Sequence, residues 1–174
     1  VAHIKNTRTP FSIDFGVGDV IVPKQEKRKI PTQLDDFASP TVNTYSLETT
    51  IAEKLDAILD LMEFSSRMKD YYDIYYLANK FDFDGATLTK ALKKTFENRG
   101  HAFTIEQFEQ VMAFAENDAM QKKWKAFCRK IDTKTDDFNA VLKTIKAFLI
   151  EPFMAAVENK EFEEKWSAAD GEWM

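Results

Sequence analysis

The sequence is poor in the residues that build disulfide bonds and zinc sites. It holds one cysteine, Cys128, within a stretch of helical character, and two histidines, His3 and His101, that stand far apart. A single cysteine excludes a disulfide framework within the chain, and two distant histidines form no zinc motif.

Turn-forming residues and long apolar runs are also scarce. The 174 residues include 5 glycines and 5 prolines against 15 phenylalanines, a balance that favours helices over a turn-rich β fold. No run of about 18 apolar residues occurs and no signal peptide is visible. We therefore expect no membrane partner, and a cytoplasmic protein is the default expectation.

Positive charge is limited as well. The formal net charge is −5, and no long basic arm suggests sequence-independent binding of nucleic acid. A local basic run, Lys122-Lys123-Trp124-Lys125 with Arg129 and Lys130 close behind, is interpreted as solvated helix surface. The chain is long enough for one domain with a full core.

The stretch from Thr44 to Leu77 carries the clearest pattern and predicts two consecutive helices joined by a short turn. On a helical wheel the first helix has an apolar stripe and an opposite acidic face. The stripe consists of Leu47, Ile51, Leu55, Ile58 and Met62, and the acidic face consists of Glu53, Asp56, Asp60 and Glu63. The apolar face of the second helix consists of Tyr71, Ile74, Leu77, Ala78 and Phe81.

Three charged residues depart from this pattern. Lys54 lies at the edge of the apolar stripe of the first helix, and Arg67 and Asp70 fall inside the apolar arc of the second. Charges on a buried face are costly unless they are paired or used. Two interpretations are open: a structural ion network in which Arg67 pairs with Asp70 and Lys54 reaches water, or a polar site presented to a ligand.

The N-terminal residues differ in character from the rest. Residues 11–22 alternate large apolar side chains with Ser, Asp and Gly, which predicts a β-strand. So short a strand needs partners, and it either forms a hairpin with Val1–Ile4 or pairs with strands further upstream. Residues 24–43 are predicted to be a loop. We predict two domains: a sheet remnant plus loop over residues 1–42 and a helical bundle over residues 43–174.

Capping residues predict the ends of the helices. Ser46 is the expected N-cap of the first helix. The other expected boundaries are Ser65 or Ser66 for the second helix, Asp82 or Asp84 and Gly100 for the third, Thr104 in a capping box with Gln107 for the fourth, Asn117 or Asp118 for the fifth, and Asp136 for the sixth, with an end or kink at Pro152. Trp166 and Trp173 are candidate docking points of the C-terminus.

Three motifs in order resemble a known family. They are Tyr45–Glu48, Ala52–Lys54 and Arg67–Asp73, preceded by Ile13–Asp19. Together they resemble the AbiEii/AbiGii-type nucleotidyltransferase toxins of toxin–antitoxin and phage-defence (abortive infection) systems, most closely over residues 11–100. The resemblance implies a mainly α chain: a helical bundle with a short N-terminal β piece left from a nucleotidyltransferase-like α/β core.

The resemblance also implies roles for the three exceptional charges. Lys54 would contact the phosphate of a nucleotide, and Arg67 would support Asp70 or bind phosphate. Asp70 would be the acidic catalytic partner, as a base or an orienting group. Nucleotidyl transfer develops charge on phosphate oxygens, which fixed cations stabilise, and a carboxylate can position or deprotonate the acceptor hydroxyl.

Other carboxylates are implied in metal binding and support. In the superfamily, carboxylates of the N-terminal sheet hold Mg²⁺, which bridges the triphosphate of the NTP. Asp14 is the candidate metal ligand. Asp19 is the competing choice, with a Gly-Asp turn as its structural alternative. Asp73 is a further candidate for a supporting role in the site.

The chain departs from the family in one respect. It has no Gly-Ser pair followed by Asp-x-Asp, and Asp82-Phe-Asp84, which has the letters, is predicted to cap a helix. Without the first two metal ligands, the chain alone is not expected to catalyse transfer. NTP and Mg²⁺ are expected for the intact enzyme and are not required by this chain. We expect a C-terminal part of a longer toxin whose N-terminal half is missing.

Two functions compete. The leading hypothesis is the C-terminal part of a toxin that, when intact, transfers a nucleotide from an NTP to an RNA or protein acceptor; its expected partners are the N-terminal half, an RNA acceptor and an antitoxin protein. The alternative is a non-catalytic helical interaction or scaffold module, for example one that binds an antitoxin. Convergence of Lys54, Arg67 and Asp70 on an open cleft beside Asp14 favours the first, and full pairing beneath phenylalanine side chains favours the second.

Overall fold

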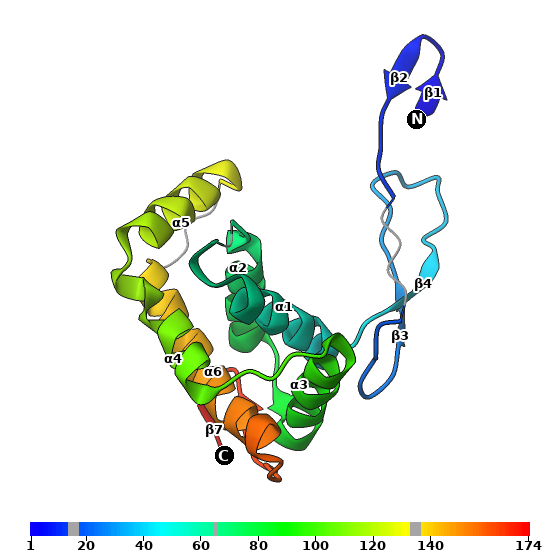
Figure 1. Cartoon of the computed structure of the whole chain (residues 1–174). Helices are drawn as coiled ribbons and strands as arrows, with labels where there is room; N and C mark the ends of the chain where they lie inside the picture. Colours follow the sequence, from blue (N-terminus) through cyan, green and yellow to red (C-terminus); the bar gives the residue numbers. More distant parts are fainter. Residues whose placement is uncertain (14–17, 65, 133–136) are drawn as a thin grey trace.

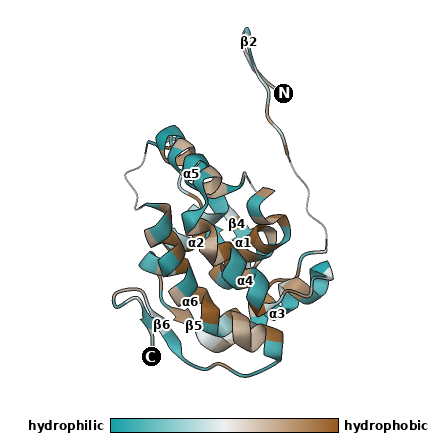
Figure 2. Cartoon of the chain, turned by 60° about the vertical axis from the view of Figure 1, so that its left-hand side comes forward, coloured by the Kyte–Doolittle hydropathy of each residue, from teal (hydrophilic) through white to brown (hydrophobic). Residues whose placement is uncertain are grey.

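The helices pack together, and the N-terminal segment extends away from them as an arm. The structure, a computed structural model, describes residues 1–13, 18–64, 66–132 and 137–174. Figures 1 and 2 both show the first strands at the far end of this arm, well separated from the helices. The prediction of a mainly helical chain with a short N-terminal β piece is confirmed.

The helical part follows the predicted order. The α-helices are α1 (Leu47–Leu61), α2 (Met68–Lys80), α3 (Gly85–Arg99), α4 (Ile105–Met112), α5 (Asp118–Lys130) and α6 (Phe138–Glu158), and the 3-10 helices are η1 (Met62–Phe64) and η2 (Ala113–Glu116). The described strands are short and all pair antiparallel: β1 (Ala2–Ile4) with β2 (Thr7–Thr9), β3 (Glu26–Lys29) with β4 (Thr41–Thr44), and β6 (Lys165–Ser167) between β5 (Phe83–Asp84) and β7 (Glu172–Trp173).

Helix α6 supplies much of the core. It packs against α2, α3 and α4, and Figure 2 shows apolar residues along it. Its predicted stripe is buried throughout: Phe138, Val141, Leu142, Ile145, Phe148 and Leu149. Each such side chain contributes about 1.5–3 kcal/mol through removal from water. In the described part of the chain, no helix combines the length and the apolar character that crossing a bilayer requires.

Local capping signals placed most helix ends correctly. The Ser46 hydroxyl accepts from the Thr49 N–H at 3.1 Å, and the Asp84 carboxylate accepts from the Thr87 N–H at 2.8 Å. Gly100 ends α3 in the left-handed conformation, which glycine adopts without a steric penalty. The capping box of Thr104 and Gln107 and the Asn117 cap are also present. Because caps depend on neighbours in sequence, they need no tertiary information.

The predicted N-caps of two helices, α2 and α6, are not confirmed. Arg67, rather than Ser66, stands at the N-cap of α2, and no described side chain caps this end. Asp137 caps α6, accepting from the Ala140 N–H at 2.9 Å; Ser65 and Asp136 lie outside the described residues. Pro152 does not end α6, which continues to Glu158.

One of the two predicted pairings of the N-terminal strand, the hairpin with Val1–Ile4, is wrong. β1 pairs with β2 across the two residues Lys5 and Asn6, and not with the described part of residues 13–22, and no strand occurs in the described part of residues 11–22. A two-residue turn closes a much shorter loop than the predicted hairpin, so its entropic cost is lower. The predicted loop at residues 24–43 contains β3 and most of β4; β3 is fully charged and β4 is mainly polar, so neither gave an alternating apolar pattern.

The segment before the bundle is fixed to the start of α1. The Val22 N–H donates to the Thr49 hydroxyl oxygen at 2.8 Å, and the Val22 carbonyl accepts from the hydroxyls of Ser46 and Thr49. Both hydroxyl residues are buried. Buried polar groups are stable only when they are hydrogen-bonded, so these bonds define where the arm meets the bundle.

The two C-terminal tryptophans dock on backbone carbonyls that lack a helical partner. The Trp166 Nε1–H donates to the Ala78 carbonyl at 2.7 Å, in the last turn of α2. The Trp173 Nε1–H donates to the Phe148 carbonyl at 3.0 Å. That carbonyl lies four residues before Pro152, which has no N–H to offer it. The two indole N–H groups therefore supply hydrogen-bond donors to backbone carbonyls that have no partner N–H within their own helix, one near a helix end and one before a proline.

Replacing Trp173 by phenylalanine should lower the free energy of unfolding by about 1–3 kcal/mol, because the ring is kept while the Phe148 carbonyl loses its donor. Urea unfolding measures this change. Adding Pro152→Ala should recover part of the loss, since this substitution restores an N–H four residues beyond Phe148. Equal effects of Pro152→Ala with and without Trp173→Phe would contradict the assignment.

Candidate functional site

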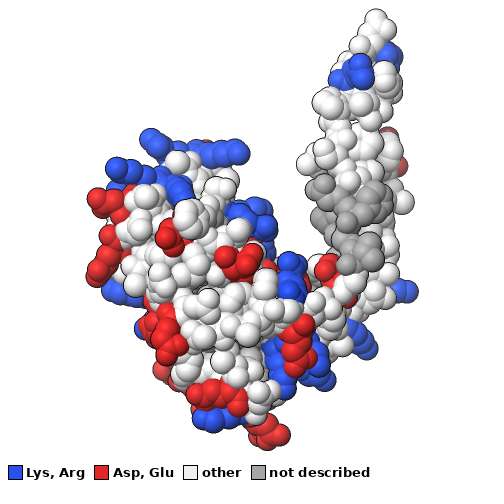
Figure 3. Space-filling view, in the orientation of Figure 1, with Lys and Arg blue, Asp and Glu red and all other residues white. Residues whose placement is uncertain are grey.

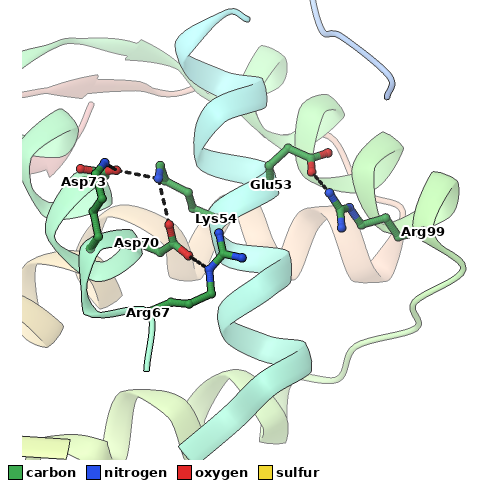
Figure 4. A network of polar contacts seen from close by, with 7 residues as sticks. Glu53, Lys54, Arg67, Asp70, Asp73 and Arg99 are labelled. Atoms are coloured by element: carbon green, nitrogen blue, oxygen red, sulfur yellow. Dashed lines mark hydrogen bonds and ion pairs between the residues drawn. The ribbon is translucent and has the colours of Figure 1, made fainter. Parts of the chain in front are cut away.

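Helices α1 and α2 bring together four of the charged residues singled out in the sequence. Lys54, on α1, points toward α2, where its Nζ lies 2.9 Å from Asp70 Oδ1 and 2.6 Å from Asp73 Oδ2. Arg67 Nε lies 2.5 Å from Asp70 Oδ2. Figure 4 shows Lys54 between the two carboxylates, with Arg67 on the other side of Asp70. The complementary charges therefore converge rather than dispersing into solvent.

Each carboxylate of this network has two cationic partners. Asp70, whose side chain is 5 % exposed, is held by Lys54 and Arg67. Asp73 is held by Lys54 and by Lys69, whose Nζ lies 2.5 Å away. Lys54 is thus the cation shared by both carboxylates. Either carboxylate keeps a positive neighbour if Lys54 turns to another anion.

The carboxylates also keep Lys54 positively charged. Partial burial by itself would lower the pKa of Lys54, because desolvation disfavours the ammonium form. Hydrogen bonds to Asp73 and Asp70 outweigh that effect and raise the pKa of Lys54 above its usual value. Lys54 is therefore cationic at neutral pH, and the stability that its pairing contributes is complete below the usual lysine pKa and is lost as the pH rises through the raised pKa.

Arg67 is less buried than the sequence predicted. Its side chain is 56 % exposed, although the helical wheel placed it inside the apolar arc of α2. The reason is that Arg67 precedes the helix, with ψ of 53° at the N-cap, so the step of about 100° per residue does not apply to it. Asp70 lies inside the helix and is buried as predicted.

An open depression lies beside the network. It has a volume of about 390 Å³ and forms where β3 and the end of β4 meet α1 and α2. Lys54 and Asp73 line it together with Tyr45, Tyr76 and Arg28, and no phenylalanine is among its described lining residues. The network is therefore both internally paired and open on one side through Lys54 and Asp73, which combines features of the two interpretations.

The remaining predicted residues lie elsewhere. Asp19 accepts a hydrogen bond from the Tyr45 hydroxyl, so it lies at the edge of the depression without a contact to Lys54. Asp14 lies outside the described residues. Asp84 is a helix cap, as predicted, and Asp82 accepts from the Ala168 N–H at 2.9 Å. Among the residues in view, no cluster of three or more His, Cys, Asp or Glu side chains could hold a metal ion.

A second ion network, which the sequence did not predict, joins α1 to α3. Asp56 is 1 % exposed, and its carboxylate contacts His101 Nδ1 at 2.8 Å and Arg99 Nε at 3.5 Å. Arg99 also bonds to Glu53, on the opposite side of α1 from Lys54 in Figure 4. Asp56 was predicted on an exposed acidic face, and this is wrong because α1 is covered by α3 as well as by α2. In the sequence, the basic residues Arg99 and His101 near the end of the third predicted helix were the available sign that an acidic residue is paired there.

Replacing Asp56 by alanine should destabilise the fold by about 1.5–3 kcal/mol, the usual value of hydrogen bonds to a charged group. The matched control is Asp60→Ala, one turn later on α1, where the side chain is exposed and the expected change is within about 0.5 kcal/mol. Thermal or urea unfolding of both variants measures the difference. Similar stabilities would show that the buried contacts of Asp56 contribute little.

The first network has the chemical features that phosphate chemistry uses. A protonated lysine faces an open depression, and a buried carboxylate one contact away holds that lysine in place. A fixed cation stabilises negative charge on phosphate oxygens, and preorganisation avoids the cost of moving dipoles during reaction. The second network is closed between helices, so it is better suited to joining α1 and α3.

Comparison with known families gives one match. The family model described as "Nucleotidyl transferase AbiEii toxin, Type IV TA system" matches residues 2–167. Comparisons with curated proteins and with solved structures found no match. The matched region includes both helices of the charged network and the arm before them.

Proposed function

We propose that this chain, which belongs to the AbiEii nucleotidyl transferase toxin family of type IV toxin–antitoxin systems, binds the phosphates of a nucleoside triphosphate at Lys54. Family membership implies an NTP as the substrate of nucleotidyl transfer, Mg²⁺ as its metal cofactor and an antitoxin as the functional partner. The proposal rests on one observation: Lys54 is a shared cation that faces an open depression.

The pairing of Lys54 allows it to bind a phosphate without leaving a buried carboxylate unpaired. Asp73 keeps Lys69 as a partner, and Asp70 keeps Arg67. When a phosphate enters the depression, Lys54 can exchange Asp73 for a phosphate oxygen, since both are anionic acceptors on its open side. A charge-assisted bond of this kind is about twice as strong as a neutral one.

Asp70 is proposed to orient Lys54 and to act on the acceptor hydroxyl. Its two oxygens are held separately, Oδ1 by Lys54 and Oδ2 by Arg67. This arrangement fixes the plane of the carboxylate. A carboxylate held in this way can position an acceptor hydroxyl or take its proton, which typically contributes about 100- to 10,000-fold in rate.

Metal binding is proposed to require groups beyond those described. The described residues do not assemble a metal site, and the sequence lacks the Gly-Ser…Asp-x-Asp motif. We therefore propose that these 174 residues act as the C-terminal part of an active toxin, with the first two Mg²⁺ ligands on an N-terminal half and Asp14 as the third. The nucleotide would pass to an RNA or protein acceptor.

Titration of the chain with a nucleoside triphosphate, followed by calorimetry or a fluorescent analogue, tests the proposal. Lys54→Gln should weaken binding at least about tenfold, because a hydrogen bond to a charged group contributes about 1.5–3 kcal/mol. Lys69→Gln is the matched control: Lys69 also pairs with Asp73 but is exposed and does not line the depression, so binding should be nearly unchanged.

The alternative function, a scaffold without catalysis, is favoured by the complete pairing of Asp70 and Asp73. It predicts a different outcome of the same titration. Lys54→Gln would then lower the stability of the fold and leave nucleotide binding, weak or absent, equal to that of the unaltered chain. This result would replace the phosphate-binding role with a structural one.

A further inference from the structure

The depression beside Lys54 is charged in one part and aromatic in another. Lys54 and Asp73 line it where they form their ion pair, and the side chains of Tyr45 and Tyr76 line it as well. Leu47 also lines the depression. It lies seven residues before Lys54 on α1, which is about 10 Å along the helix axis. The depression therefore extends from the ion network toward the start of α1.

The part of the depression away from Lys54 offers apolar walls. A half-buried leucine from each of α1 and α2 lines it. The two threonines that line it donate their hydroxyl groups to backbone carbonyls, Thr44 at 3.2 Å and Thr50 at 2.9 Å. Arg28 is paired with Glu26 at 2.5 Å. Because these polar groups already have partners, this part suits an apolar surface better than a second unpaired charge.

The ring of Tyr76 is held in place and is still open to solvent. It stacks on Tyr72, with ring centroids 6.3 Å apart and the planes 25° apart, and its hydroxyl accepts from Lys80 Nζ at 2.6 Å. Even so, Tyr76 is 43 % exposed. A ring that is already ordered loses little freedom when a ligand packs on it, so less binding energy is lost to ordering.

Tyr45 is held in a comparable way. Its hydroxyl donates to Asp19, which fixes the far end of the ring, and 40 % of the residue is exposed. The depression thus has two ordered, exposed aromatic side chains in addition to the cation Lys54. Exposed aromatic rings of this kind are platforms on which nucleic-acid bases stack, because every base has a π-face.

We infer that Tyr45 and Tyr76 form the subsite for the base of the nucleoside triphosphate whose phosphates lie at Lys54. This inference rests on the proposed function and deepens it, since it assigns the part of the nucleotide that Lys54 does not bind. A nucleotide joins a polyanion to a flat base through a sugar. The depression presents the complementary groups, a cation and exposed aromatic rings, along one surface.

Titration of the whole chain with ATP and, separately, with inorganic tripolyphosphate tests the inference, because both ligands carry a chain of phosphates and only ATP carries a base. Tyr76→Ala should weaken ATP binding about tenfold, within the usual loss for one stacked base, and should leave tripolyphosphate binding unchanged. Tyr45→Ala should act in the same way. Tyr76→Phe should recover most of the affinity lost in Tyr76→Ala, because the ring is restored. Circular dichroism confirms that each variant is folded.

The control addresses attraction of phosphates by charge alone. Figure 3 shows Lys and Arg side chains along the edge of the molecule formed by α5, which lies on the opposite side of the helices from the arm in Figure 1. Such a surface attracts any polyanion. Lys125→Gln, on α5, should therefore change the affinities for ATP and tripolyphosphate by the same small factor. Their ratio should stay as in the unaltered chain, whereas Tyr76→Ala should lower the preference for ATP.

The two ligands also separate failure of this inference from failure of the proposed function. Lys54→Gln should weaken both ligands at least about tenfold. If it does so while Tyr76→Ala weakens neither ligand or both equally, the base subsite alone is overturned. If Lys54→Gln weakens neither while Tyr76→Ala weakens ATP alone, the phosphate role of Lys54 is overturned and the base subsite stands. Equal affinities of the unaltered chain for ATP and tripolyphosphate would overturn the base subsite, and no binding of either ligand would overturn both.

Discussion

Asp70→Asn should lower nucleotidyl transfer by about 100-fold or more in an active form of the toxin, while nucleotide binding changes little. The substitution keeps the size of the side chain and removes its charge, so the acceptor hydroxyl loses its base or orienting group. Lys54 retains Asp73 as an anionic partner, which keeps the phosphate-binding cation in place. The rate of transfer at saturating NTP is the quantity to measure.

The design separates the roles of the two residues. Lys54→Gln should act mainly on NTP binding, whereas Asp70→Asn should act mainly on the rate of the bound complex. Asp60→Asn, which changes an exposed carboxylate of the other ion network, is the control and should keep full activity and growth arrest. Normal growth arrest in Asp70→Asn would remove Asp70 from the catalytic machinery.

Trp166→Ala should destabilise the bundle by about 3–5 kcal/mol, the usual range for deletion of a buried large aromatic ring. Trp166 is 2 % exposed and contacts Phe148 and Trp173 with ring centroids 5.0 and 5.5 Å away. Its loss also leaves the Ala78 carbonyl without its indole donor. Urea unfolding followed by circular dichroism measures the effect.

Two variants calibrate this prediction. Trp166→Phe keeps most of the ring but not the donor, so an intermediate loss is expected. Phe64→Ala removes an equally apolar ring that is 86 % exposed, and the change should stay within about 0.5 kcal/mol. A loss below about 1 kcal/mol in Trp166→Ala would show that the C-terminal strands add little to the bundle.

Helix boundaries followed from the sequence where the signals are local. Ser46, Asp84 and Thr104 accept hydrogen bonds from residues three positions later, so sequence spacing contains the whole interaction. The strands of the arm could not be predicted from the sequence, because strand pairing depends on which segments meet in space. The short β1–β2 hairpin, the charged strand β3 and the polar strand β4 lack the alternation of large apolar residues that marks a strand.

The candidate site was predicted in part for a related reason. Lys54 and Asp70 stood out because each placed a charge where apolar residues recur, and periodicity reveals such exceptions. Asp56 did not stand out, since a wheel assumes one buried face and α1 packs against α2, α3 and α4. The basic residues of α5 were visible as a run, but that Lys122, Lys125, Arg129 and Lys130 form no ion pair within the described part of the chain required coordinates.

The sequence by itself determined the helical class, most helix ends and the identity of the charges that break the pattern, because these depend on residue type and on spacing within one or two turns. The tertiary structure decided the partners: Lys54 between Asp70 and Asp73, Asp56 beneath Arg99 and His101, and Trp166 on Ala78. Contacts between residues far apart in the chain form only when packing brings their helices together, and no local pattern encodes that geometry.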